Sequence, residues 1–382
     1  MAKIQTSVRG WGSPSRYFQG PGLLMELSKY TGIYGTKAFA IIDQFFFEKL
    51  TGQLQEQFAA VNAQIDTVIF NSEVTEARIE IAAQKAKASN PDVIVAIGGG
   101  KTIDTSKAVA DILNVPIIVV PTSASTDAPT IALSVLYSEE GKHIKERHYK
   151  TNPDIVLMDS QIIAQAPARF LVAGMGDALS TVFEARASVA TDSANFVSGG
   201  YRGTKTGLMI AELCYDTLMK NGLKALQAAE HGIVTEALED VIEVNTLMSG
   251  LGVENNGCAG SHSICEGISV LPEDSKTFHG EKVGFGVICQ LMAENAPLKT
   301  LQEILSFSVE IGLPITLDDL FIKNTSENIH AIAQQSMKSY WQIEPFFINA
   351  DMVANAITAA DEFGKRFRNN IGGAPAYTHR NC

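Results

Sequence analysis

The chain has 382 residues, of which 46% are hydrophobic and 19% charged, and its formal net charge is −12. This length allows two domains with separate cores, and the acidic balance argues against nucleic-acid binding, since contacts to phosphates need a basic surface. No apolar run approaches the roughly 18 residues of a membrane span, and the first residues lack the apolar stretch of a signal peptide, so we expect a cytoplasmic protein with no membrane partner.

The first part of the chain alternates strand-like and helix-like segments. Runs rich in Val and Ile predict strands over residues 37–43, 67–70, 92–97, 116–120 and 154–159. Apolar residues at helical spacing predict helices over residues 47–58, 75–89 and 102–113. The polar stretch 135–149 fits a hairpin. Short apolar strands bracketed by helices predict a parallel sheet covered on both faces.

After about Pro167 the pattern changes to long amphipathic stretches with helical periodicity and no intervening strand signals. We therefore expect an α/β domain over residues 1–165 and an all-α domain over residues 166–382.

Three glycines, Gly98, Gly99 and Gly100, stand where the third predicted strand runs into a helix. Such a turn lets the backbone approach a pyrophosphate, and the helix N-terminus offers free N–H groups. A purely structural tight turn is the alternative. The following Lys101 and Thr102 resemble the end of a P-loop, but Val95 occupies the position of that motif's first glycine.

Polar residues also follow two other predicted strands. Asp43 ends the first strand, where a carboxylate accepts hydrogen bonds from both ribose hydroxyls and repels a 2′-phosphate, which favours NAD over NADP. A helix N-cap is the alternative role for Asp43. The loop 121–129, dense in hydroxyl groups, lies at the carboxyl end of the fourth strand, where open α/β sheets bind ligands.

Asp177, His262 and His279 are candidate metal ligands, although they are far apart in sequence. One carboxylate and two imidazoles suit a divalent metal such as zinc, with a fourth position open for water or substrate. The remaining histidines are interpreted as structural: His143, His148, His231, His330 and His379.

Five segments resemble the glycerol dehydrogenases of the iron-containing alcohol dehydrogenase superfamily, in order and over about residues 10 to 368. They are residues 98–104, 121–129, 174–178, 250–254 and 278–283. The resemblance implies a dehydroquinate-synthase-like fold with the active site between the two domains. It also implies NAD, one zinc ion per chain, and oxidation of glycerol and related vicinal diols through a zinc-bound alkoxide and hydride transfer to nicotinamide. Relatives are often octameric, so a homo-oligomer is expected.

The resemblance assigns roles to individual residues. Asp177, His262 and His279 are the implied metal ligands, and Asp127 is the implied catalytic residue that contacts the polyol. The expected cofactor-binding positions, the glycine turn included, are Asp43, Gly98, Gly99, Gly100, Lys101, Asp104, Thr122, Ser125, Leu133 and Tyr137.

The chain departs from its relatives at three positions. Thr181 stands where iron-dependent relatives carry a histidine, and the loss of that ligand favours zinc over iron. Cys265 and Glu266 stand where glycerol dehydrogenases tend to have His and Asn, and we expect them to influence the polyol pocket.

Other functions remain open at this point. A dehydroquinate-synthase-like lyase or a glycerol-phosphate dehydrogenase would need a basic cluster for a phosphorylated substrate, and few basic residues lie near the motifs. A nucleotide sensor without catalytic activity would keep the glycine turn but would not need the three ligands.

Overall fold

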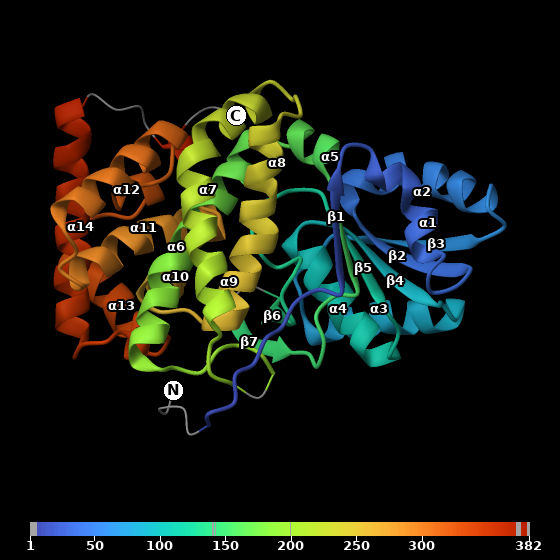
Figure 1. Ribbon diagram of the computed structural model, residues 1–382, viewed down its shortest axis with the longest axis horizontal. Coiled ribbons are helices and arrows are strands. Elements are labelled where there is room, and N and C mark those ends of the chain that lie inside the picture. The colour runs from blue at the N-terminus through green and yellow to red at the C-terminus, as the bar shows by residue number, and fades with distance from the viewer. Residues whose placement is uncertain (1–5, 140, 142, 199, 372–375, 380–382) are drawn as a thin grey trace.

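The computed structural model describes residues 6–139, 141, 143–198, 200–371 and 376–379. Most of the N-terminal residues on which the expected lack of a signal peptide rests lie outside these ranges. The molecule has a sheet-containing half, which begins with β1 at Arg16 and ends with β8 at Asp159, and a helical half beside it (Figure 1).

The first half is built on a six-stranded parallel sheet in the order β1-β8-β5-β4-β2-β3. Its strands are β1 (Arg16–Gly20), β2 (Lys37–Asp43), β3 (Gln64–Phe70), β4 (Val93–Gly98), β5 (Ile117–Pro121) and β8 (Ile155–Asp159). The predicted strands and the parallel sheet are confirmed. The strand β1 was not predicted, because it lies at the edge of the sheet, is only partly buried and carries no apolar run.

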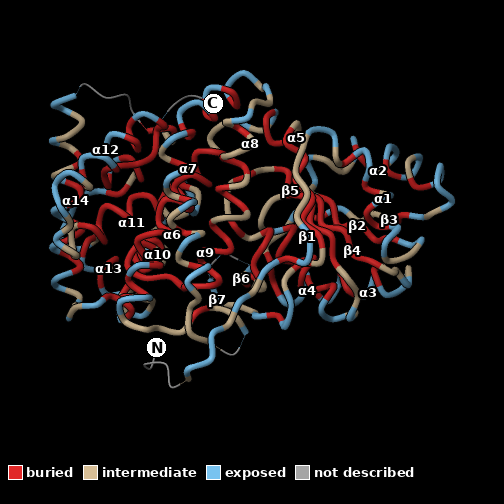
Figure 2. Tube along the Cα trace, viewed as in Figure 1, coloured by how far each residue is buried: buried red, intermediate tan, exposed pale blue. Residues whose placement is uncertain are grey.

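Alternate residues of the strands face opposite layers of helices, as the two-residue period requires. One face packs on α1 (Leu27–Thr31) and α2 (Gln44–Ala59) through residues such as Val93 and Val95. The other packs on α3 (Glu76–Ser89) and α4 (Gly100–Leu113) through Ile94 and Ala96. Both layers bury the sheet (Figure 2), so the two central strands, β4 and β5, are buried and apolar along their whole length.

A two-stranded hairpin, β6 (Leu133–Tyr137) and β7 (His143–His148), confirms the predicted excursion and lies beside α4. The helical half contains α5 (Ser160–Gln165), α6 (Ala168–Thr191), α7 (Lys205–Glu230), α8 (Glu236–Glu243), a π-helical turn (Val244–Met248), α9 (Ser249–Asn256), α10 (Gly260–Ile268), α11 (His279–Ala293), α12 (Leu298–Ile311), α13 (Ser326–Ser336) and α14 (Ala350–Ile371). Its apolar core includes side chains from most of these helices.

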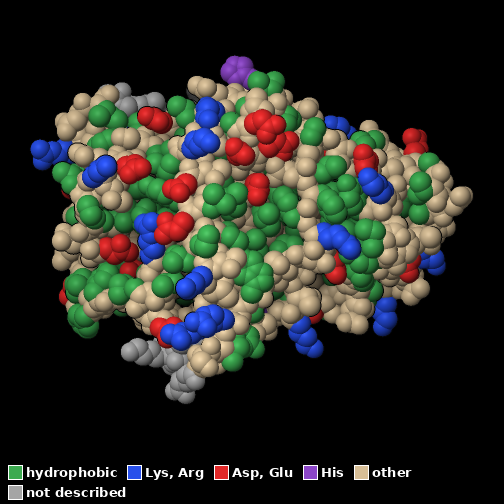
Figure 3. Space-filling model, in the orientation of Figure 1, with side chains coloured by type: hydrophobic (Ala, Val, Ile, Leu, Met, Phe, Trp, Pro, Cys, Tyr) green, Lys and Arg blue, Asp and Glu red, His purple; other side chains and the backbone are tan. Residues whose placement is uncertain are grey.

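The α/β half followed by helices is the expected fold class. Acidic and basic side chains are interspersed on the face drawn in Figure 3. Within the described part of the chain, no helix combines the length and the apolar character that a membrane span needs.

Candidate active site

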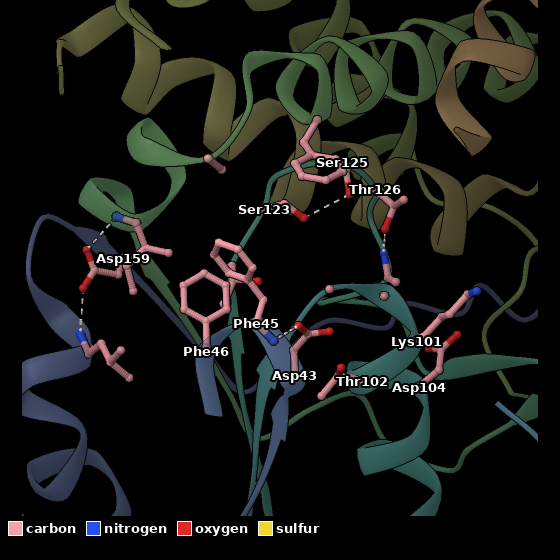
Figure 4. A pocket seen from close by; sticks show the side chains of 18 of the residues that line it. Asp43, Phe45, Phe46, Lys101, Thr102, Asp104, Ser123, Ser125, Thr126 and Asp159 are labelled. Carbon is pink, nitrogen blue, oxygen red and sulfur yellow. Dashed lines mark hydrogen bonds between the residues drawn. The ribbon is translucent and has the colours of Figure 1, made fainter. Parts of the chain in front are cut away.

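A cavity of about 1090 Å³ lies at the carboxyl ends of the strands and extends to the helical half. Figure 4 shows Asp43 and Thr102 beside the strand ends and the hydroxyl-bearing loop with Ser123 and Ser125 across from them. The wall on the helical side includes His279. One cavity therefore joins the glycine turn to a predicted metal ligand.

All of the predicted cofactor positions except Gly98 line this cavity. They are Asp43, Gly99, Gly100, Lys101, Asp104, Thr122, Ser125, Leu133 and Tyr137. Gly98 instead allows a close contact inside the fold, since a Cβ there would lie 2.7 Å from Thr102 Oγ1.

The glycine turn leaves the N-terminus of α4 open toward the cavity. Gly99 is the N-cap residue and supplies no side-chain hydrogen bond to the first turn. At both Gly99 and Gly100, an added Cβ would meet no atom within 4 Å. Free N–H groups at the start of a 14-residue helix, facing open space, suit a phosphate.

Asp43 has the helix-capping role that was the alternative to ribose binding. Its Oδ1 accepts a hydrogen bond of 2.9 Å from Phe45 N and caps α2. Its carboxylate also lines the cavity, so the cap and a contact to ribose are compatible. Two other predicted cofactor residues are already paired within the protein. Lys101 forms an ion pair with Glu73, and Asp104 forms one with the buried Lys107 at 2.9 Å.

The three predicted metal ligands converge from three helices. Asp177 lies on α6, His262 on α10 and His279 at the start of α11. Asp177 Oδ1 is 3.5 Å from His262 Nε2 and 3.3 Å from His279 Nε2. Donor atoms bound to one tetrahedral zinc at about 2.0–2.1 Å stand roughly 3.3 Å from each other. The spacing therefore fits a shared divalent cation.

The surroundings of Asp177 support the same interpretation. Both of its carboxylate oxygens are buried and have no hydrogen-bond partner among the described residues besides the two imidazoles at these longer distances. A buried carboxylate without such partners is costly unless a cation or other donor satisfies it. The donor set, with its nitrogen and oxygen atoms, is one that zinc accepts.

Two buried carboxyl groups in this region have opposite pKa shifts. Burial raises the pKa of Asp177, but His279 and His262 outweigh it and hold that pKa well below its ordinary value. Burial and the charge of Asp177 raise the pKa of Asp127 to about 7. Asp177 therefore stays ionised, and Asp127 in the cavity wall is a group that can exchange a proton near neutrality.

The loop that carries Asp127 is fixed to the helical half by residues that the sequence analysis missed. Asn245, in the π-helical turn, donates to the carbonyl oxygens of Ala124 and Leu171 at 2.9 and 3.0 Å. Thr130 Oγ1 donates to Thr246 O at 2.9 Å. The nearby Gly250 permits this approach, since a Cβ there would lie 2.0 Å from Thr130 Oγ1.

Glu184 was also missed. It is fully buried on α6, seven residues after Asp177 and so on the same helix face, and its Oε2 lies 2.6 Å from His262 Nδ1. The two-turn spacing after Asp177 was the sequence signal for it.

The structure also locates the three residues at which this chain differs from its relatives. Thr181 is buried and faces Ser249, with 3.2 Å between the hydroxyl oxygens. Cys265 is buried with its Sγ 3.4 Å from His279 Nδ1. Glu266 lies 3.7 Å from His143 of the hairpin. Cys265 therefore lies behind His279, the predicted ligand that lines the cavity.

Comparison with known proteins agrees with this arrangement. Residues 14–160 match the family described as iron-containing alcohol dehydrogenase. A glycerol dehydrogenase of Thermotoga maritima is 41% identical, over 94% of this chain and 98% of the relative. A glycolaldehyde reductase of Halobacterium salinarum is 39% identical, over 93% and 98%.

A solved structure, that of a probable glycerol dehydrogenase from Sinorhizobium meliloti, superposes with a TM-score of 0.89 at 39% identity and covers 94% of this chain and 99% of that one. Near full-length similarity at this identity, together with the converging ligands and the glycine turn, leads to one conclusion: the chain belongs to the iron-containing alcohol dehydrogenase family.

Proposed function

We propose that this protein oxidises glycerol, or a related vicinal diol, with NAD as hydride acceptor, and that the product from glycerol is dihydroxyacetone. The single observation that carries the proposal is the cavity that joins the open N-terminus of α4 to His279. Relatives named glycerol dehydrogenase, at about 40% identity, support the choice of substrate.

We assign NAD to the strand-end side of the cavity. The N–H groups at Gly99 and Gly100 would bind its pyrophosphate, and Asp43 would accept hydrogen bonds from ribose and disfavour a 2′-phosphate. Asp177, His262 and His279 would hold the divalent cation. The absence of a fourth protein ligand at Thr181 favours zinc.

In this mechanism the residues of the site have different tasks. A divalent cation held by the three proposed ligands would supply Lewis acidity that favours loss of the substrate hydroxyl proton. Asp177 stays ionised, so that its negative charge would stabilise the cation. Asp127, whose pKa is raised to about 7, binds a neighbouring hydroxyl and accepts or returns a proton at its carboxylate. Asn245 and Thr130 hold the loop of Asp127 in place, so the substrate carbon is oriented toward the nicotinamide position.

The larger organisation also belongs to this proposal. Residues 1–165 would form the NAD-binding domain and residues 166–382 the metal-binding domain. We propose a cytoplasmic homo-oligomer, an octamer by resemblance to relatives.

An assay of NADH absorbance tests the function. Purified protein is given NAD with glycerol, butanediols or glycerol phosphate, and NADH with glycolaldehyde, each with and without a chelator. We expect chelator-sensitive turnover of glycerol. Preferential reduction of glycolaldehyde would assign the activity of the Halobacterium salinarum relative instead, and turnover of glycerol phosphate alone would contradict the proposal.

A further inference from the structure

The N-terminal turn of α10, which carries His262, is held by buried side chains from three other segments. Glu184 Oε1, from α6, accepts hydrogen bonds from Ala259 N at 2.7 Å and His262 N at 2.9 Å. Glu344 Oε1 accepts from Gly260 N at 3.0 Å, and Gln290 Oε1, from α11, accepts from Ser261 N at 2.9 Å. Every N–H group from Ala259 to His262 is thereby satisfied.

Glu184 differs from the other two because it also contacts the histidine ring. Its second oxygen, Oε2, lies 2.6 Å from His262 Nδ1. A carboxylate accepts hydrogen bonds, so Nδ1 carries a proton, and in the neutral ring that metal binding requires the lone pair of Nε2 points at the site shared with Asp177. One side chain thus fixes the backbone, the orientation and the tautomer of this ligand.

We propose that Glu184 is a positioning residue that prepares His262 to bind the metal. This inference rests on the proposed metal site and extends it to a residue outside the ligand set. Hydrogen-bonded partners of metal-binding histidines typically contribute 10–100-fold to metal affinity, because they orient the ring and increase its basicity.

Among the residues that the structure describes, the second histidine, His279, has no comparable partner. Nδ1 of His279 faces Cys265 Sγ at 3.4 Å, and a thiol is a weak hydrogen-bonding group. The His279 side chain is 42% exposed, compared with 13% for His262. We therefore expect the order imposed on the site before metal binds to come mainly from the Glu184–His262 pair.

The substitution Glu184→Gln tests this role sharply. In the described part of the chain, the Glu184 carboxylate accepts from Ala259 N, His262 N and His262 Nδ1, and glutamine replaces one acceptor by a donor. Its amide NH₂ must then face either the backbone N–H groups or the ring N–H. Glu344→Gln is the matched control. Glu344 is a buried acid that caps the same turn, and its only backbone donor is Gly260 N within the described part of the chain, so the amide oxygen can still accept that bond.

The measurement is zinc affinity of the full-length protein, by competition with a chromophoric chelator, together with the visible spectrum of the cobalt-loaded protein. We expect Glu184→Gln to raise the zinc dissociation constant 10–100-fold and to shift the cobalt bands, while Glu344→Gln stays within threefold of the unaltered protein. If Glu184→Gln fails to fold, Glu184→Asp takes its place in the same comparison with Glu344→Gln. Aspartate keeps both acceptor oxygens but is one methylene shorter.

Several outcomes overturn the inference. Equal zinc affinity in the Glu184→Gln and unaltered proteins would remove the role of Glu184 alone, whereas an unaltered protein that binds no stoichiometric zinc would remove the proposed metal site itself. If both glutamine variants weaken zinc binding equally, Glu184 acts only as a helix cap. Cys258 Sγ also lies close to the Glu184 and His262 donor atoms, within 4.8 Å. A second equivalent of zinc that Cys258→Ser abolishes would make Glu184 a ligand instead.

Discussion

The side chains of Asp177, His262 and His279, the proposed metal ligands, are each held in place in a different way. Asp177 is buried on α6, and His262 is held by Glu184. His279 begins α11, and Glu281 of the same turn accepts from Phe278 N and pairs with Arg169 at 2.7 Å. Each ligand therefore depends on its neighbours, and removing one ligand should affect metal binding more than folding.

Replacing His279 by Ala should abolish stoichiometric metal binding and most turnover while the protein stays folded. Two remaining ligands bind a divalent cation much more weakly than three, and the histidine is partly exposed, so its loss creates little buried cavity. Metal content per chain, circular dichroism and the NADH assay check this. His231→Ala, at an exposed position at the end of α7, is the control. Normal metal content in His279→Ala would remove this histidine from the ligand set.

Replacing Asp43 by Asn should separate its two roles. Asparagine still caps α2, so the unfolding free energy should hardly change, whereas Asp43→Ala should lose about 1 kcal/mol. Both variants lose the negative charge that would repel a 2′-phosphate. We expect the NAD-to-NADP preference in kcat/KM to fall by about tenfold, equivalent to ~1.4 kcal/mol. An unchanged preference in Asp43→Asn would place the ribose away from this carboxylate.

At the scale of elements, glycines let α6 and α11 approach closely enough to bring Asp177 and His279 together. A Cβ added at Gly280 would lie 1.8 Å from Ala173 O, and one added at Gly176 would lie 2.2 Å from Gly280 O. These glycines are next to the two ligands in sequence. The glycine-flanked segments of the sequence therefore serve helix packing, which in turn sets the ligand spacing.

Substituting Gly280 by Ala should push these helices apart. We expect a loss of stability of roughly 1–3 kcal/mol, typical of overpacking, together with weaker zinc binding. Urea unfolding and chelator competition measure the two effects. Gly52→Ala is a matched control, since it lies in α2 and an added Cβ meets nothing within 4 Å. That control should be neutral or stabilising by up to about 1 kcal/mol. Unchanged metal affinity in Gly280→Ala would show that the close crossing is not needed for ligand spacing.

At the scale of the whole molecule, a buried acid lies where the two halves and the N-terminal segment meet. Glu254 of α9 accepts a hydrogen bond from Asn152, and its neighbour Asn255 exchanges hydrogen bonds of 2.8 and 2.9 Å with the backbone of Gly12. Burial raises the pKa of Glu254 to about 7, against opposing effects of Asn152 and Lys107. Glu254 therefore keeps its proton in the folded protein at pH values where the unfolded chain has lost it.

This pKa makes stability depend on pH. Between about pH 4.5 and 7 the folded state binds more protons at Glu254 than the unfolded state, so the unfolding free energy falls as pH rises through that range and levels off above it. The contribution is about 3 kcal/mol for a shift of this size. Glu254→Gln should remove it, since glutamine is neutral and can still accept from Asn152. Urea unfolding at pH 5 and pH 8 should show a smaller loss in the variant. An identical loss in both proteins would contradict the assignment.

The division of the chain at residues 165 and 166 stays a prediction, as do the cytoplasmic location, the oligomer and the role of each site residue. Hydrogen bonds of Glu254, Asn245 and Thr130 connect residues on the two sides of this predicted boundary. The two halves therefore pack together across it. The cavity takes its walls from both halves.

The sequence by itself determined the α/β layers, because runs of Val and Ile between amphipathic helices can only be buried as a covered parallel sheet. It also located the glycine turn and singled out Asp177, His262 and His279 as candidate ligands, because their residue types carry the chemistry. The sequence did not predict the edge strand β1, because a partly buried strand carries no apolar run. Only the tertiary structure decided that Glu184 holds His262, that Lys107 already pairs with Asp104, and that the acids Asp127 and Asp177 have opposite pKa shifts. Those properties depend on distances between segments far apart in the chain, and local periodicity contains no information about such distances.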